Sequence, residues 1–290
     1  MSYLFYLILF IFGLIIGSFL NVVSLRFKPE NQVFDLKIIN GRSACSYCRK
    51  TLCWYELVPI VSFFIQSGKC RSCGHKLSRQ YPIVELLSGL IFAAVPFFIH
   101  YRSSLPDYYR FGSWSIWTLV FLVLLLISVI DFRHFIIPDE LTWMLIFFGL
   151  ALIILQSQIP NFNFFDQSFL RHYALLFGWP GNIWLNRLFA ALTSSVFFGL
   201  LFFLGKGKMM GGGDVKLGFA LGWLLGWPDI ILTLVISFMI GGATGFILMI
   251  NRKRTMKDSL PLAPFLAIGF VLTVFFGYQI INGYFSLMGL

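Results

Sequence analysis

The sequence predicts an all-α polytopic membrane protein with about eight transmembrane helices and one cysteine-rich insertion. Hydrophobic residues make up 58% of the 290 residues and charged residues only 12%, which lies outside the usual range of soluble domains. The apolar residues gather in runs of about 20, the length at which a helix crosses the hydrocarbon core of a bilayer. All five cysteines lie in one polar stretch after the first run.

The expected spans follow one another along the chain and are joined by polar loops. The first has neither a basic start nor a small-residue cleavage site, so we expect a retained helix and not a secretory signal. The sixth is the shortest and opens after three consecutive glycines. The eight runs cover residues 3–25, 82–100, 114–131, 140–156, 186–205, 214–228, 230–250 and 262–285.

Lysine and arginine residues indicate the orientation of the spans, because basic residues gather in cytoplasmic loops. Eighteen of them lie in the loop 26–80, in the turn after residue 131, and in the loops 206–216 and 251–258, and four lie on the opposite side. We therefore expect the loop 26–80 in the cytoplasm and both termini outside. The net charge of +10 then reflects topology and contact with lipid headgroups, and nucleic-acid binding is not expected.

We divide the chain into three parts: a first transmembrane helix (1–25), a cytoplasmic loop domain (26–80) and a transmembrane core (81–290). The core contains a second long loop, 157–185, which is rich in Phe and Trp. Aromatic residues favour the level of the lipid headgroups, so this loop is expected to lie at the membrane interface.

Two CxxC pairs in the loop domain predict a zinc site. The pairs "CSYC" and "CRSC" stand 21 residues apart, and each can hold one side of a metal ion from a tight turn. The thiolates of Cys45, Cys48, Cys70 and Cys73 would complete a closed, structural Zn²⁺ site of the zinc-ribbon type. Two disulfides or free thiols are the alternatives, but disulfides rarely persist in a reducing cytoplasm.

Cys53 and His75 are further candidates in the same loop. Cys53 is expected to be an ordinary apolar residue near Trp54, and His75 follows Cys73 by two residues. Either side chain could replace one of the four thiolates as a ligand.

Three aspartates stand at the cytoplasmic ends of expected helices. An ionisable group at such a place is costly unless it is paired or wet, so each needs a physical reason. Asp139 follows Pro138 and precedes an apolar run, the usual position of a helix N-cap. Asp131 ends a helix, where the macrodipole disfavours negative charge, so a partner or a proton is expected.

Asp214 opens a helix, where the dipole favours an anion, and N-capping is one interpretation. Gly218, Gly222 and Gly226 follow at intervals of four. These small residues share one helix face and would let another helix approach closely, so we expect Asp214 to face protein. The glycines at 211–213 allow positive φ and the close approach of a substrate chain.

Asp131 and Asp214 together suggest two carboxyl groups that share a proton. If they come within hydrogen-bond reach, repulsion leaves one as an acid and the other as a base near neutral pH. The base can then activate a water molecule for attack on a peptide carbonyl, while the acid protonates the departing amide.

The order of these motifs resembles that of bacterial type IV prepilin peptidases, membrane aspartic proteases of the GxGD type. The resemblance covers nearly the whole chain and implies that Asp131 and Asp214 are the catalytic pair and that the four paired cysteines bind Zn²⁺. It rests on "GSFLNVVSLR" (17–26), the cysteine loop, "SRQYPIVELLSG" (78–89), "DFRHFIIPD" (131–139) and "GGGDVKLG" (211–218).

The resemblance also implies a reaction and a place for it. Members of the family cleave the basic leader of type IV prepilins or type II secretion pseudopilins after a glycine, at the cytoplasmic face of the bacterial inner membrane. Many also methylate the new N-terminal residue with S-adenosylmethionine. Where the family usually has Phe-Gly-Pro before the last span, this chain has Leu262 and Ala263 before Pro264.

Two other classes of function are compatible with the residues themselves. A proton- or cation-coupled transporter or channel would use the aspartates for ions and the cysteine loop for regulation, although transport sites tend to lie nearer the midplane. A zinc-stabilised assembly protein would use the acids only to cap helices. Cleavage of a pilin precursor separates the peptidase interpretation from both.

Overall fold

The computed structural model is built of helices, as the sequence predicts. Apart from two isolated β-bridges in the cysteine-rich loop, the residues that it describes form no extended pairing. The chain divides into two compact units, Met1–Arg102 with Trp117–Leu126, and Ser103–Ile116 with Ile127–Leu290. The structure describes residues 3–30, 32–35, 40–102, 107–158, 168–177, 182–205, 210–251 and 260–289.

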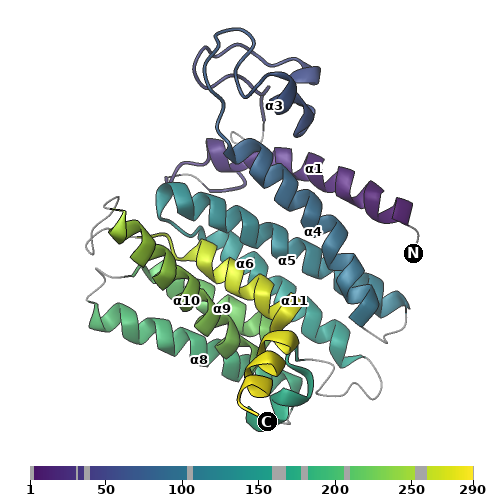
Figure 1. Cartoon of the computed structure of the whole chain (residues 1–290), viewed down its shortest axis with the longest axis vertical. Helices are drawn as coiled ribbons and strands as arrows, with labels where there is room; N and C mark the ends of the chain where they lie inside the picture. The colour runs from purple at the N-terminus through teal and green to yellow at the C-terminus, as the bar shows by residue number, and fades with distance from the viewer. Residues whose placement is uncertain are drawn as a thin grey trace. The chain divides into compact units, whose positions relative to one another are not determined.

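The α-helices of the two units are labelled in Figure 1. The first unit contains α1 (Tyr3–Arg26), η1 (Trp54–Glu56), α3 (Val61–Ile65) and α4 (Gln80–Arg102). The second contains α6 (Asp139–Ser157), η2 (Arg171–Phe177), α8 (Ile183–Leu204), α9 (Gly212–Leu225), α10 (Asp229–Ile250) and α11 (Ala263–Leu287). Both units include residues of α5 (Asp107–His134).

Seven helices in the described part of the chain are long and apolar enough to cross a membrane, which supports a multi-pass membrane protein. They are α1, α4, α5, α6, α8, α10 and α11. The sixth expected span corresponds to α9, which has 14 residues. At 1.5 Å per residue it extends about 21 Å, short of the ~30 Å hydrocarbon core of a bilayer.

Glycines bring α1 and α4 of the first unit into close contact. A Cβ added at Gly17 would lie 2.7 Å from the Cα of Glu85, so no side chain fits there without moving the backbone. Near the loop end of the pair, the side-chain amide of Asn21 donates to the carbonyl of Tyr81 at 3.1 Å. The motifs at 17–26 and 78–89 therefore form one packed helix pair.

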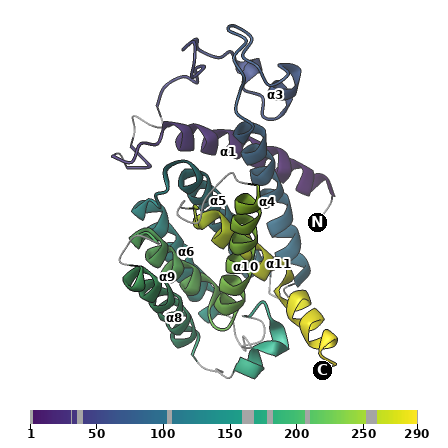
Figure 2. The same ribbon diagram turned by 60° about the vertical axis from the view of Figure 1, so that its left-hand side comes forward.

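The glycine face of α9 lets α8 approach in the same way, as expected from the spacing of its glycines. A Cβ added at Gly222 would lie 2.5 Å from the carbonyl oxygen of Ala190 on α8. Gly226 ends the helix with a φ of 82°, a left-handed conformation that glycine adopts without strain. On its other side α9 contacts α6, so the short helix packs between two long ones (Figure 2).

Gly222→Ala is expected to destabilise the second unit. The added methyl group would meet backbone atoms of α8, and overpacking of this kind costs about 1–3 kcal/mol. Gly199→Ala is the matched control, because a Cβ at Gly199 on α8 meets nothing within 4 Å and alanine is the better helix former. Thermal unfolding in detergent should show a lower midpoint for Gly222→Ala alone, and equal midpoints for both variants would contradict the packing.

A buried polar cluster fixes the far end of α9. The guanidinium of Arg187, which is fully buried, donates to the carbonyl of Leu224 and, at 3.3 Å, to the side-chain oxygen of Gln156. The side chain of Asn186 makes two hydrogen bonds with the backbone of Trp227, at 2.9 and 3.0 Å. These contacts satisfy polar groups that would otherwise be costly inside the bundle.

The loop 157–185 is described only in part. Residues 159–167 and 178–181, which carry part of the expected interfacial segment, lie outside the described residues. Within the described part, the Ser168 hydroxyl and the Phe169 N–H donate to the carboxylate of Asp229 at 2.8 and 2.9 Å. The loop is thereby held at the start of α10, and its place relative to the headgroups stays a prediction.

Candidate functional site

Asp131 lies in the last turn of α5 and is buried, with 4% of its surface exposed. Its Oδ2 atom accepts a hydrogen bond of 3.0 Å from the backbone N–H of Ala263, the first residue of α11. The positive end of the α11 dipole therefore compensates for the unfavourable end of α5. The sequence predicted that Asp131 needs a partner or a proton but did not identify the partner, although Pro264 is a signal for a helix start at this point.

Asp214 lies in the first turn of α9 and is partly buried. Its Oδ2 atom accepts a hydrogen bond of 3.1 Å from the N–H of Gly211, the residue before the helix. Asp214 thus reaches back to cap its own helix, one of the two roles considered for it. It also lies close enough to Asp131 for the two carboxyl groups to interact electrostatically.

The glycines before Asp214 allow close approach, but their backbone differs from the expectation. Gly211 has a φ of −81°, and among the described glycines those with positive φ lie elsewhere in the chain. Gly212 and Gly213 are already part of α9. A Cβ added at Gly213 would lie 3.1 Å from the Cβ of Ile137, so the glycine loop packs directly against the segment that connects α5 to α6.

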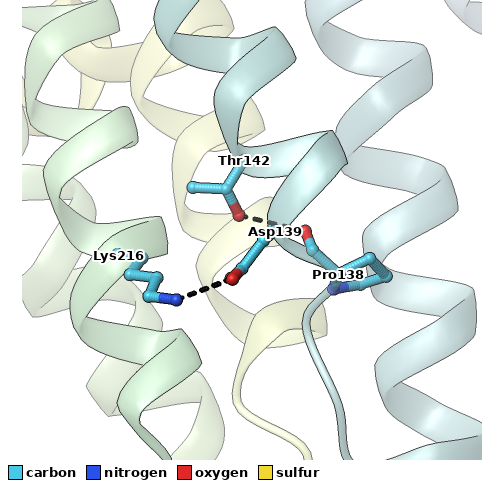
Figure 3. Close-up of polar contacts among 4 residues, drawn as sticks. All are labelled: Pro138, Asp139, Thr142 and Lys216. Atoms are coloured by element: carbon cyan, nitrogen blue, oxygen red, sulfur yellow. Dashed lines mark hydrogen bonds and ion pairs between the residues drawn. The ribbon is translucent and has the colours of Figure 1, made fainter. Parts of the chain in front are cut away.

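The N-cap interpretation of Asp139 is wrong. The cap position is occupied by Pro138, and α6 begins at Asp139. No side chain among the described residues caps the start of this helix. Its two carboxylate oxygens instead accept hydrogen bonds from the ammonium group of Lys216 on α9, both at 2.8 Å (Figure 3). The missed partner stands two residues after Asp214, on a helix that the sequence alone could not place beside α6.

Breaking the Asp139–Lys216 ion pair is expected to change the stability of the protein little. Both side chains are more than half exposed, at 58% and 57%, and exposed ion pairs contribute about 0–1 kcal/mol to stability. We expect the coupling in a double-mutant cycle with Asp139→Asn and Lys216→Met to stay within this range and to shrink at high salt. Unfolding measured at two salt concentrations checks the size of the coupling energy and its salt dependence. A larger coupling energy that does not depend on salt would contradict the exposure of the pair.

The four paired cysteines come together in the loop of the first unit. The sulfur atoms of Cys45, Cys48, Cys70 and Cys73 all lie within 4.8 Å of one another, and the Cys45 and Cys73 sulfurs are 3.9 Å apart. A tetrahedral ion with Zn–S bonds of about 2.3 Å needs sulfurs about 3.8 Å apart. All five cysteines of the chain are free, so the disulfide alternative is not supported.

Each CxxC pair sits on a tight turn. The N–H of Cys45 donates to the carbonyl of Lys50 at 3.0 Å, and that of Cys70 donates to the carbonyl of His75 at 2.9 Å. The rings of Tyr47 and His75 stack with their centroids 4.4 Å apart, so each turn supplies one aromatic face to the other. Like Cys53, His75 stays outside the thiol cluster.

The ionisation of the thiols is consistent with a bound cation. The backbone N–H groups of Cys48 and Tyr47 lower the pKa of Cys45 to about 7. At Cys73 the N–H of His75 lowers the pKa, but burial and the three neighbouring thiols outweigh it and raise the pKa to about 11. Four thiolates therefore repel one another unless a cation lies between them, and the donor set fits Zn²⁺.

Fold and site together define a polytopic helical membrane protein with one carboxyl group at the end of a helix, a second near the start of another helix, and a four-thiol loop. The family model "Type IV leader peptidase family" matches residues 118–246, and "Bacterial Peptidase A24 N-terminal domain" matches residues 11–99. The chain belongs to the type IV leader peptidase family, which confirms the resemblance and, at the level of the family, the expectation of an enzyme.

Relatives cover nearly the full length of the chain. A protein of Bacillus subtilis (strain 168) named "Prepilin leader peptidase/N-methyltransferase" is 33% identical over 280 residues, 96% of each chain. Proteins of the same name from Pseudomonas aeruginosa and Aeromonas hydrophila are each 29% identical, over 96% and 98% of this chain and 92% and 95% of their own. No solved structure matches the chain.

Proposed function

We propose that this protein cleaves the leader peptide of type IV prepilins or pseudopilins and N-methylates the residue that becomes the new N-terminus. The names of the relatives support both activities. The observation that carries the peptidase half is that the charge of Asp131 acts on Asp214, and these two carboxyl groups come from different helices of the same unit. We assign the catalytic roles to these two residues.

The proposed chemistry needs one protonated and one ionised carboxyl group. The ionised carboxylate removes a proton from a water molecule as the oxygen attacks the scissile carbonyl carbon. The protonated carboxyl group then gives its proton to the departing nitrogen, and the carbon–nitrogen bond breaks. One proton is taken up and one is released, so the pair finishes the cycle with the same total of protons.

Backbone contacts of the pair support these roles. Each carboxyl group receives one N–H at a helix start, from Ala263 for Asp131 and from Gly211 for Asp214. A single anchoring bond fixes the orientation of a carboxyl group and leaves its second oxygen for chemistry. Because like charges close together cannot both ionise cheaply, one shared proton is the favoured state of such a pair.

We further propose that the aspartate pair acts at the cytoplasmic face of the bacterial inner membrane. The distribution of lysine and arginine supports this orientation, with eighteen of these residues on the side of the loop 26–80 and four on the other. Both aspartates stand at helix ends, where a substrate helix could remain in the bilayer while its leader extends into water.

A Zn²⁺ ion held by Cys45, Cys48, Cys70 and Cys73 would have a structural role. Four thiolates complete its coordination, so it would supply folding energy to the loop and no site for water. Methyl transfer would use S-adenosylmethionine, as the name of the relatives suggests. Among the described residues we assign no binding site to this cofactor.

Mass spectrometry of a co-expressed pilin tests the proposal directly. Loss of the leader together with a gain of one methyl group at the new N-terminus is the expected result. An intact precursor, produced alongside a well-folded membrane protein, would refute the peptidase half. In that case cation flux into liposomes containing the purified protein would favour the transporter alternative.

A further inference from the structure

The cysteine-rich loop of the first unit exposes a run of large apolar side chains. Phe64 and Ile65 on α3 are 69% and 66% exposed, and Trp54 on η1 is 80% exposed. Exposed apolar clusters of this kind mark interaction sites. We call the surface of residues 54–65 the loop patch; its exposed members are Trp54, Tyr55, Leu57, Val58, Val61, Phe64 and Ile65.

The exposed side chains of the loop patch are separate from the apolar side chain that packs inside the loop. Phe63 turns inward, where its ring lies 3.2 Å from the position that a Cβ would take at Gly68. Gly68 has a φ of 66°, and this left-handed turn after α3 folds the chain back over Phe63. The neighbouring Phe64 and Ile65 are left pointing away from the loop.

A hydrogen bond fixes the depth of the loop patch along α4. The N–H of Ile60, at the start of α3, donates to the Oε2 atom of Glu85 at 2.7 Å. Glu85 is buried and lies five residues after Gln80, where α4 begins. Five residues of helix correspond to about 7.5 Å. The loop patch therefore begins beside the second turn of a helix that is apolar enough to cross the membrane.

The apolar surface continues from the loop patch onto α4. Ile83, Leu86 and Leu87, which flank Glu85 in the sequence, are exposed as well. On a membrane-spanning helix such side chains face lipid. The same lipid is then within reach of the loop patch, because Ile60, within the segment 54–65, lies at the level of Glu85.

The charge of the loop complements anionic phospholipid. Residues 40–80 contain seven lysine and arginine residues and a single acid, Glu56. The guanidinium carbon of Arg71 lies 5.2 Å from the centre of the Tyr55 ring, so a cation stands directly beside the loop patch. The basic residues are Arg42, Arg49, Lys50, Lys69, Arg71, Lys76 and Arg79, and all are exposed.

We propose that the loop patch docks into the headgroup region of the bilayer leaflet at the loop ends of α1 and α4, and that this leaflet is anionic. Aromatic and aliphatic side chains next to cations are the composition of interfacial membrane-binding segments. The Glu85 hydrogen bond ties the loop patch to α4 at this level. Docking holds the four-cysteine loop against the membrane surface and does not depend on the function proposed above.

Photo-crosslinking in nanodiscs tests the docking. The full-length protein with Phe64→benzoylphenylalanine is placed in bilayers of phosphatidylcholine with phosphatidylglycerol, and adducts are identified by mass spectrometry. Ser46→benzoylphenylalanine is the matched control, because Ser46 is exposed on the first cysteine turn, outside the loop patch. We expect a lipid adduct at position 64 in several-fold higher yield than at position 46, and a several-fold loss when phosphatidylglycerol is omitted.

Other products would overturn the proposal. An adduct from position 64 to another segment of the chain, or to a second copy, would show a protein-binding surface instead. A yield of lipid adduct no higher than at position 46 would exclude docking. A yield independent of phosphatidylglycerol would exclude a preference for an anionic leaflet. Retained zinc shows that the loop is folded, and Ile65→benzoylphenylalanine replaces the first variant if it loses the metal.

Discussion

Asp131→Asn and Asp214→Asn are each expected to lower the rate of leader cleavage by about 10²–10⁴-fold, the usual contribution of a general acid or base. Asparagine keeps the volume of aspartate, and its side-chain oxygen can still accept the N–H of Ala263 or Gly211. The fold should therefore persist while the exchangeable proton is lost. Time courses of leader removal with a purified prepilin, in detergent or nanodiscs, measure the effect.

The double variant gives a sharper test of the pair. If the two carboxyl groups act on the same proton, removing the second should add little to the loss caused by the first. Independent contributions would multiply instead. Asp139→Asn is the matched control, because Asp139 is exposed and paired with Lys216, and it should cleave at nearly the unmodified rate. Full cleavage by either single variant would contradict the assignment of the pair.

The helical architecture could be predicted because apolar runs and glycine spacing are properties of single segments. Seven of the eight spans expected from the apolar runs are long apolar helices in the structure. The glycine spacing of α9 likewise predicted its close contact with α8. The sixth span was harder to predict. The corresponding helix, α9, has only 14 residues, and glycines at both ends make its limits hard to read from the apolar pattern. Packing between neighbouring helices, not length, holds α9 in place.

The site could be predicted only in part, because its contacts join segments far apart in the sequence. Asp131 and Asp214 were recognisable as costly charges, and in the structure both belong to the second unit, where the charge of Asp131 acts on Asp214. The hydrogen bond from Ala263 to Asp131 joins residues 132 positions apart, and no local sequence pattern predicts it. Asp139 was misread for the same reason, since its local context favours a cap and its partner Lys216 comes from another helix.

Cys70→Ser is expected to remove the metal and unfold the loop domain. Structural zinc contributes roughly 10–16 kcal/mol of apparent binding free energy, and a loop with little core of its own depends on it. Zinc content measured by mass spectrometry should fall from about one ion per chain to well below that value. Trypsin should then cut the full-length protein after Arg71, within the second cysteine turn, and after Lys76, just beyond it.

Cys53→Ser is the matched control for the metal site. Cys53 lies in the same loop and is exposed, but its sulfur stays outside the cluster of four. The variant should keep its zinc and resist trypsin as the unmodified protein does, because nothing in the tetrahedral donor set changes. Zinc loss in Cys53→Ser with retention in Cys70→Ser would mean that another set of thiols binds the ion. A strong chelator should make the unmodified protein behave like Cys70→Ser, since both remove the same cross-link between the two turns.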